Sequence, residues 1–466
     1  MQRNSCLIFG LILTVCGYSS SVGAETLQEA LASAYVGNPT LQSQRAHLRA
    51  VDEQVPQALS NWRPVVTLTG DLNRTNTFQK APAMTLAGTQ LQSGTVIANG
   101  KTATLSISQP LFRGGRTVAQ TEQAEAQVLA GRAQLAETEQ TVLLNVVNAY
   151  MNVVQGQAVL DLTINNEQVL QRQLDATNDR FRVGEVTRTD VSQAESRLSA
   201  AHADRTQAEG TLRAAVANYV NVVGHAPDHP VPPGPIGGLP TSIDDAQGQA
   251  LAGNPAVTSA QHSYEAARHG VDLVAGELLP TVALNGQMIR SYDYQGPQTF
   301  QRVYQAGVNV SIPIYQSGQE YARLRAQKQT ASQARTDVDV ARRDLTESVT
   351  KAWQALDTAR ARIMSYTDQI TAAQVALEGV QRESQVGSRT VLDVLNAEQE
   401  LLNARVNLVQ AQHDETVAAY QLKSTLGQMS AQALALPVQV YDPQQHYDEV
   451  RGKWIGVGSG PADGQE

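Results

Sequence analysis

Two stretches of the sequence share one pattern: VGSRTVLDVLNAE at residues 386–398 and VGEVTRTDVSQAE at residues 183–195. Both contain Val-Gly, a Thr three positions after the Gly, and an Asp three positions after the Thr. A Gly directly after a helix commonly ends that helix as its C′ residue. A Thr followed three positions later by an acidic residue is a capping pattern that starts a helix. Each stretch therefore predicts a turn between two helices.

The two turns belong to a repeat that runs through most of the chain. Residues 110–224 match residues 313–427 at an offset of 203 without a gap. Nearer the N-terminus the offset is 216, because Gly-Asn-Pro at 37–39 recurs at 253–255 and Pro64 recurs as Pro280. The first copy is longer by 216 − 203 = 13 residues, which lie between Pro64 and Pro110. We expect these residues to form a loop of variable length.

This arrangement predicts five segments: a signal peptide at 1–24, a first repeat at 25–224, a Pro/Gly-rich connector at 225–241, a second repeat at 242–427, and a C-terminal segment with a tail at 428–466. An apolar run after Arg3 and small residues before Ala24 indicate a secretory signal cut after Ala24. A lipoprotein signal ending at Cys16 is the alternative, although Val15 is larger than the residue expected there. Cleavage after Ala24 would remove both cysteines, and with them any disulfide.

Long helices are predicted on either side of each turn. Capping pairs at Thr26/Glu29 and Ser242/Asp245 mark two further helix starts. Residues 116–182 contain no Pro and carry apolar residues at heptad spacing: Val128, Leu135, Val142 and Ala149, interleaved with Val146, Val153 and Leu160. This spacing is typical of a coiled coil, and a helix of that range is about 100 Å long. Helices near 26–60 and 188–223 are about half as long, which predicts a helical tower with little globular core.

Between the helices the apolar period changes from 3.6 to 2. Alternation predicts strands at about 64–76, 101–112, 280–292 and 302–315, each with one apolar and one polar face. Two interpretations fit these strands, an ordinary half-buried hairpin and membrane barrel strands. The export signal and the missing globular core favour the membrane. Four strands cannot close alone, since small barrels need about 8, so several subunits must share one barrel.

Composition excludes several classes of function. The 35 Lys and Arg residues against 44 Asp and Glu residues give a net charge of −9 without a long basic run, which argues against a nucleic-acid partner. No nucleophile or metal motif is found, so the sequence predicts neither an enzyme nor a cofactor. His225 and His229 straddle the Pro-rich connector, where we expect neither carboxylates nor thiolates nearby, so a solvated loop explains them better than a metal site. Residues 456–460 resemble a phosphate loop but precede no helix, which indicates disorder.

The turn at 386–398, together with the one at 180–191, resembles the TolC family of outer-membrane efflux ducts. The resemblance covers about residues 25–430, and residues 441–454 are similar to TolC proteins of alphaproteobacterial type. It implies a mainly α fold with a β-barrel portion: a homotrimer whose 12-stranded barrel lies in outer-membrane lipid and continues into a long periplasmic α-helical barrel. The C-terminal segment would be equatorial. Such a duct is passive and serves drug efflux or type I secretion with a periplasmic adaptor and an inner-membrane pump of RND or ABC type. A structural coiled-coil protein without a pore is the alternative function.

The resemblance also assigns roles to turn residues. A periplasmic gate would place Thr189 and Asp190 against Gln385 and Arg389, and Asp393 at a constriction. Asn396 stands where the family has a second constriction acid, which leaves one acidic residue per chain. Simple helix capping is the alternative explanation of Asp190 and Asp393. Adaptor docking is expected at six turn residues: Val183, Gly184, Thr187, Val386, Gly387 and Thr390.

Overall fold

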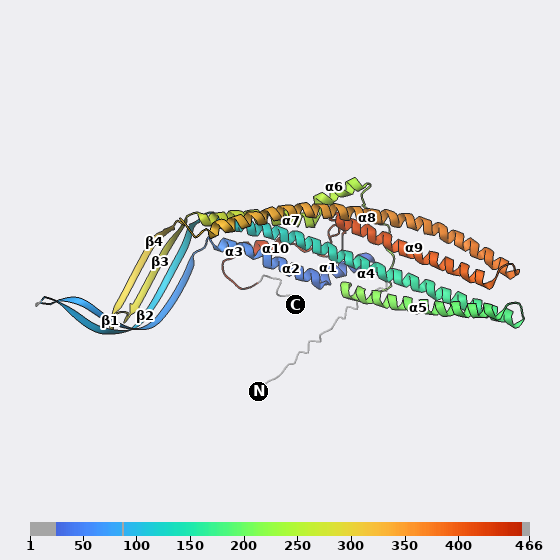
Figure 1. Ribbon diagram of the computed structural model, residues 1–466, viewed down its shortest axis with the longest axis horizontal. Coiled ribbons are helices and arrows are strands. Elements are labelled where there is room, and N and C mark those ends of the chain that lie inside the picture. Colours follow the sequence, from blue (N-terminus) through green and yellow to red (C-terminus); the bar gives the residue numbers. More distant parts are fainter. Residues whose placement is uncertain (1–24, 86–87, 459–466) are drawn as a thin grey trace, which may run out of the picture. The chain divides into compact units, whose positions relative to one another are not determined.

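The structure, a computed structural model, describes residues 25–85 and 88–458 of the chain (Figure 1). The signal peptide expected at 1–24 and the end of the tail at 459–466 lie outside the described residues. The chain forms two compact units. Within the described residues, unit 1 contains 25–33, 146–235 and 369–410, and unit 2 contains 34–85, 88–145, 236–368 and 411–458. Each sequence repeat contributes to both units, because the long helices run from one unit into the other.

The element order is the same in both copies of the repeat. The first copy contains the helices α1 (Leu27–Gly37), α2 (Pro39–Asp52), α3 (Gln54–Ser60), α4 (Arg116–Arg182) and α5 (Arg188–Val223). The second contains α6 (Ile243–Gly253), α7 (Pro255–Ala275), the short 3-10 helix η1 (Gly276–Leu278), α8 (Gln319–Gln385) and α9 (Val391–Thr425), followed by α10 (Gln445–Arg451).

The helix expected near 26–60 is three helices, so that expectation was wrong. Pro39 lacks an N–H and cannot continue α1, whereas it suits the first turn of α2. Asn38 caps the new helix, its Oδ1 accepting from the Thr40 N–H at 2.9 Å. Asn254 does the same for α7, accepting from the Ala256 N–H at 2.9 Å. The Asn-Pro of each repeat is therefore a break between two capped helices.

The predicted helix starts and the predicted heptads are confirmed. The Thr26 and Ser242 hydroxyls accept from the N–H groups of Glu29 and Asp245 at 3.3 and 3.2 Å. The range of α4 is the one expected, and Leu160 alone of its seven heptad residues is only half-buried. The buried ones are Val128, Leu135, Val142, Val146, Ala149 and Val153. Side-chain burial every three to four residues holds α4 in the helical state over its whole length.

Unit 2 contains an antiparallel sheet of four strands: β1 (Val65–Thr85), β2 (Gly88–Arg113), β3 (Thr281–Tyr292) and β4 (Phe300–Ser311), in the order β1-β2-β3-β4. Polar residues pair across one face of the sheet. Ser108 donates to the Asn285 Oδ1 at 2.7 Å, and Gln287 donates to the Gln305 Oε1 at 2.6 Å. The predicted alternation thus separates polar from apolar side chains onto opposite faces.

The first hairpin is longer than expected. Its 13 additional residues do not form a loop but extend β1 and β2, whose register continues without interruption from Val65↔Ser108 to Thr85↔Gly88. Cross-strand hydrogen bonds hold these residues in the ladder, although they include Gly and Pro. Pro82 is tolerated because β1 is an edge strand, and Pro110 lies at a shift of register between β2 and β3. In the second hairpin β4 ends at Ser311 rather than near 315, two residues before Pro313.

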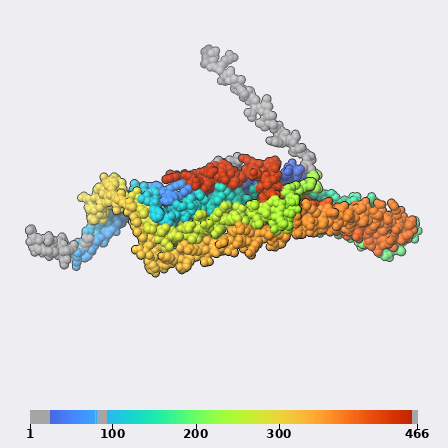
Figure 2. Space-filling model, turned by 90° about the horizontal axis from the view of Figure 1, so that it is seen from above, coloured from blue at the N-terminus to red at the C-terminus, as the bar shows by residue number. Residues whose placement is uncertain are grey.

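The core of unit 2 is a set of small helix-to-helix clusters. One joins α6, α7, α8 and α9 through Ala250, Val257, Val349 and Leu422, and another joins α3 and α4 through Val55 and Val128. The C-terminal residues lie against earlier helices (Figure 2). There His446 of α10 pairs with Asp52 at 3.1 Å and Arg451 pairs with Glu125 at 2.8 Å. In the described part of the chain, no helix has the length and apolar character needed to cross a membrane.

Candidate functional site

The candidate site consists of two turns in unit 1. Residues 183–187 join α4 to α5, and residues 386–390 join α8 to α9. Gly184 and Gly387 have left-handed backbones, with φ of 84° and 77°. The N–H groups of Gly184 and Glu185 donate to the carbonyls of Phe181 and Arg180 at 3.0 and 2.9 Å, and residues 387 and 388 repeat the pattern. This is a Schellman motif, so both glycines end their helices as predicted.

Each turn is completed by a capping box. The Thr187 hydroxyl accepts from the Asp190 N–H at 3.3 Å, and the Asp190 carboxylate accepts from the Thr187 N–H at 2.9 Å. Thr390 and Asp393 form the same box with distances of 3.2 and 3.0 Å. Hydrogen bonds from the Thr390 N–H and hydroxyl to the ionised carboxylate hold the pKa of Asp393 below its usual value. Capping therefore explains both acids locally, as the alternative interpretation expected.

The tips of both turns carry exposed apolar side chains. Val183 is 72% exposed and Val386 is 78% exposed, and each directly precedes the Gly that ends its helix. Thr187, Thr189, Gln385 and Thr390 are exposed as well. A largely exposed valine at the same position of both copies is not required by either the Schellman motif or the capping box. The turns thus offer two equivalent small apolar surfaces.

Arg389 does not contact the first-copy turn within the described part of the chain. Its Nε donates to the Glu383 Oε2 at 2.9 Å, on the last turn of α8. Arg180 makes the corresponding pair with Glu185 at 3.2 Å in the first copy. The expected contact of Arg389 with Thr189 and Asp190 is therefore not made within one chain, where Arg389 pairs with Glu383 instead. The pair raises the pKa of Arg389, which is charged in any case.

The two hairpins contact each other on α5 and α9, beyond the two capping boxes. The Arg197 Nη2 on α5 donates to the Asn396 Oδ1 on α9 at 2.8 Å. Beside this bond is an apolar cluster of Leu170, Ala194, Ala201, Val391 and Leu395, which joins α4, α5 and α9. Arg197 was not predicted as a site residue. The sequence signal that could have found it is a difference between the copies, since the second copy has the acidic Glu400 at the position that matches Arg197.

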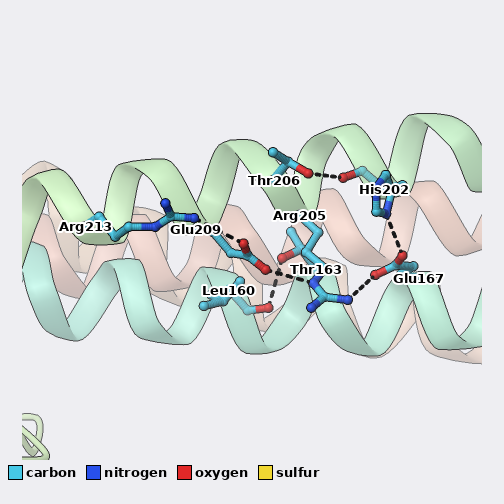
Figure 3. A network of polar contacts seen from close by, with 8 residues as sticks. All are labelled: Leu160, Thr163, Glu167, His202, Arg205, Thr206, Glu209 and Arg213. Carbon is cyan, nitrogen blue, oxygen red and sulfur yellow. Dashed lines mark hydrogen bonds and ion pairs between the residues drawn. The ribbon is translucent and has the colours of Figure 1, made fainter.

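Polar contacts hold α5 against α4 within the first hairpin (Figure 3). The Glu167 carboxylate of α4 accepts from Arg205 and from His202 of α5, both at 3.0 Å, and Arg205 also pairs with Glu209 at 3.0 Å. These hydrogen bonds lower the pKa of Glu167. In the second hairpin, Gln381 donates to Glu398 at 3.1 Å, and burial raises the pKa of this carboxyl. Both pairs fix the facing sides of antiparallel helices.

A cleft of about 820 Å³ lies between α4, α5 and α9 in unit 1. Its walls contain small residues such as Gly156 and Ala208 and several amides, among them Asn152, Gln207 and Asn403. Asp204 is the one ionisable residue among those that line it. The cleft therefore has no arrangement of acid, base and nucleophile that could catalyse a reaction.

The expectation that His225 and His229 lack nearby carboxylates was wrong, because folding brings them to a polar cluster around Glu25 and Asp228. The Glu25 carboxylate is buried and accepts from the Tyr219 hydroxyl at 2.5 Å and from the Asp228 N–H at 3.0 Å. The His225 Nε2 lies 3.7 Å from the same carboxylate, and His229 pairs with Asp228. Among residues 25–85 and 88–458, no group of three His, Cys, Asp or Glu side chains is placed to hold a metal ion.

Comparison with known proteins places this architecture in a family. The protein-family model described as "Outer membrane efflux protein" matches residues 28–225 and 247–428 of this chain. The outer membrane efflux protein BepC of Brucella suis biovar 1 is 37% identical over 452 residues, which cover 97% of this chain and 95% of BepC. The outer membrane protein TolC of Escherichia coli K12 is 26% identical over 459 residues, which cover 93% of this chain and 88% of TolC.

A solved structure agrees with this relationship at the level of the fold. The outer membrane channel CmeC of Campylobacter jejuni superposes with a TM-score of 0.75 at 15% identity, over 91% of this chain and 89% of CmeC. The chain therefore belongs to the outer membrane efflux protein family, the TolC-type channel proteins of the outer membrane that extend into the periplasm and are not enzymes.

Proposed function

We propose that three copies of this efflux protein form a passive exit duct with a shared 12-stranded barrel in the outer membrane. The open sheet carries the proposal. β1 and β4 end the strand order, so each has one neighbour within the described chain, and the edge hydrogen-bonding groups need partners inside a membrane. Apolar side chains project from these strands into open space, and Leu72 is 82% exposed. Lipid is the solvent that suits them.

Strand count and barrel size support three copies. Each chain supplies four strands, and three chains would therefore supply 12. Two chains would supply about 8 strands, which close into a barrel so narrow that side chains fill its interior. Polar side chains such as Asn285 and Gln305 would then face a water-filled interior, consistent with an exit path for polar cargo.

We assign gating to the two turns. Asp393 would line the narrow end together with Asn396, and Arg389 would join the Thr189–Asp190 turn of a neighbouring copy, with Gln385 beside it. The Glu383 pair uses only the Nε–H of Arg389, and a guanidinium has four further N–H donors for such a contact. Asp190 and Asp393 would keep their capping bonds while presenting their remaining carboxylate oxygens.

The partners would be a periplasmic adaptor and an inner-membrane pump of RND or ABC type. The exposed Val183 and Val386 beside Gly184 and Gly387 support adaptor contact at the turns, because both copies offer the same small apolar surface. Thr187 and Thr390 would fix the shape of this surface through their capping boxes. The relatives AprF and PrtF are named as protease secretion proteins and TtgC as a probable efflux pump protein, so both pump types are candidates.

The mass of the detergent-solubilised complex tests this proposal. We expect a mass of three chains in protein extracted from outer membranes, and discrete single-channel currents from the same preparation in a planar bilayer. A monomer that stays in solution without detergent and conducts no ions would instead support a structural coiled-coil protein and would overturn the duct.

A further inference from the structure

The segment after α10 carries three large apolar side chains that contact little protein. Trp454 is 66% exposed, Ile455 is 91% exposed, and Val457 is fully exposed. Single exposed apolar residues are ordinary on protein surfaces, but three within four positions form a patch. Lys453 lies in the same segment and supplies a positive charge. Apolar and aromatic side chains next to a cation are the composition of a membrane-interface segment.

Arg63 holds this segment beside the start of the sheet. Its Nη1 donates to the Lys453 carbonyl at 2.7 Å, and its guanidinium lies over the Trp454 ring, 4.7 Å from the centroid. Arg63 itself is placed between α3 and β1, since its N–H donates to the Ser60 carbonyl at 2.9 Å and Val65 begins the first strand. The segment bends from α10 toward the end of α3 (Figure 1). Trp454 is thus fixed at the level where β1 begins.

Other exposed apolar residues lie at the same ends of the strands. Trp62 and Leu279 precede β1 and β3, Phe112 is the last but one residue of β2, and Tyr315 follows β4. Gln109 fixes Trp62 by donating to its carbonyl at 2.7 Å. Rings of aromatic side chains typically mark the level of lipid head groups on membrane strands, because their apolar body and polar edge suit both sides of the interface. Trp454 therefore continues a collar at the helix-side end of the sheet.

The repeat shows that this contact is particular to the first copy. Trp62-Arg63-Pro64 corresponds to Leu278-Leu279-Pro280, so the second copy has Leu279 where the first has Arg63. A leucine cannot hold the segment through a cation and a hydrogen bond. The position of Arg63 is therefore suited to receive the C-terminal segment, a role that the second copy cannot duplicate.

We propose that Trp454, Ile455 and Val457 insert into the phospholipid head-group layer of the periplasmic leaflet, so that residues 453–458 anchor each chain to the membrane surface. The inference rests on the proposed function, in which the strands span the membrane. The anchor would continue the lipid-facing apolar surface of the sheet onto the helix-side end. It would set the depth of the strands and resist their displacement when partners pull on the helices.

Tryptophan fluorescence tests the anchor in the full-length assembly. The chain has three tryptophans, so Trp62→Phe with Trp353→Phe leaves Trp454 as the reporter. The protein is reconstituted in vesicles of phosphatidylethanolamine and phosphatidylglycerol, with or without phosphatidylcholine brominated on the upper acyl chain. We expect brominated lipid to reduce Trp454 emission severalfold, and aqueous iodide to have little effect. Trp353, alone in the matched control, packs against the α6–α9 cluster and should respond to neither.

Two further variants separate the possible failures. Leu72→Trp in a chain without other tryptophans reports whether β1 lies in lipid, and its emission should be quenched. If brominated lipid quenches Leu72→Trp but not Trp454, the anchor alone is overturned. If neither brominated lipid nor iodide quenches Trp454, the anchor is also overturned, and a second copy of the chain covers this residue. An unquenched Leu72→Trp would overturn the membrane placement of the strands. Arg63→Gln should reduce quenching of Trp454 and leave that of Leu72→Trp unchanged.

Discussion

Arg197 of the first copy donates a 2.8 Å hydrogen bond to the side-chain oxygen of Asn396 in the second copy. This bond places a permanent positive charge beside the residue for which a constriction role is proposed. The expected charge at the narrow end therefore depends on both residues. Asp393 contributes a carboxylate from each chain, and Arg197 contributes a guanidinium bonded to Asn396, three residues after Asp393.

The first prediction concerns ion selectivity. Asn396→Asp alone should change the cation preference little, because Arg197 would pair with the new carboxylate. Asn396→Asp combined with Arg197→Gln should strengthen cation preference clearly, since a ring of uncompensated like charge sets selectivity. Reversal potentials under a salt gradient measure both variants. Equal shifts of the reversal potential in the single and double variants would show that Arg197 does not neutralise a charge at position 396. An unchanged reversal potential in both variants would show that Asn396 does not lie at the constriction.

The second prediction concerns the gate. Arg389→Ser with Gln385→Ala should raise single-channel conductance severalfold, because the proposed closed arrangement would lose the hydrogen bonds that hold the two turns together. Glu383→Gln is the matched control, since it removes the partner of Arg389 within the chain and leaves the arginine available. It should conduct like the unmodified channel. A double variant with ordinary conductance would show that Arg389 and Gln385 do not hold the gate, and a lowered melting temperature in that variant would assign Arg389 to the stability of the end of α8 instead.

The third prediction separates capping from gating. Thr187→Ala removes the hydroxyl that accepts from the Asp190 N–H, and should reduce the free energy of unfolding by about 1 kcal/mol. Thr189→Ala, two residues away and outside the capping box, should change it by less than about 0.5 kcal/mol. Thermal melting of the purified assembly compares the two. Equal melting temperatures for both variants would mean that the box contributes nothing to stability.

The fourth prediction concerns the buried carboxylate of Glu25. Tyr219→Phe removes a hydroxyl that donates to it, and a buried acceptor that loses a partner costs about 1–3 kcal/mol. We expect a lower melting temperature and faster proteolysis of the connector at 225–235. Tyr321→Phe, at an exposed position on α8, is the control. Identical behaviour of the two variants would show that the cluster around Glu25 does not hold the connector.

The fifth prediction is a pH dependence. Burial raises the pKa of Glu398 above its unfolded value, so its protonated form is favoured in the folded chain. Its contribution to stability is therefore full below the unfolded pKa and falls as the pH rises through the folded pKa. Glu398→Gln keeps an oxygen that accepts from Gln381 and cannot ionise, so it should melt higher than the parent protein at neutral pH. The difference should shrink toward the unfolded pKa, near 4.5. A constant difference between these pH values would contradict this.

Local patterns were enough to predict the helices and turns. The Gly that ends each long helix and the Thr-to-Asp box that starts the next act over three to five residues, so both are visible in the sequence. The heptads of α4 indicate burial every three to four residues. Because the chain is a repeat, the same turn and capping patterns appear in both copies. The Asn-Pro break at 38–39 was present too, but a helix was expected across it.

Only the tertiary structure decided features that depend on residues far apart in the chain. The first hairpin continues to Thr85↔Gly88 because each strand is held by the other, whereas the 13-residue difference in length between the two copies indicated a loop. Arg197 pairs with Asn396 and Arg63 contacts Trp454, and both contacts join segments separated by a large part of the chain. Pairing and docking energies depend on distances in space, which local periodicity does not specify.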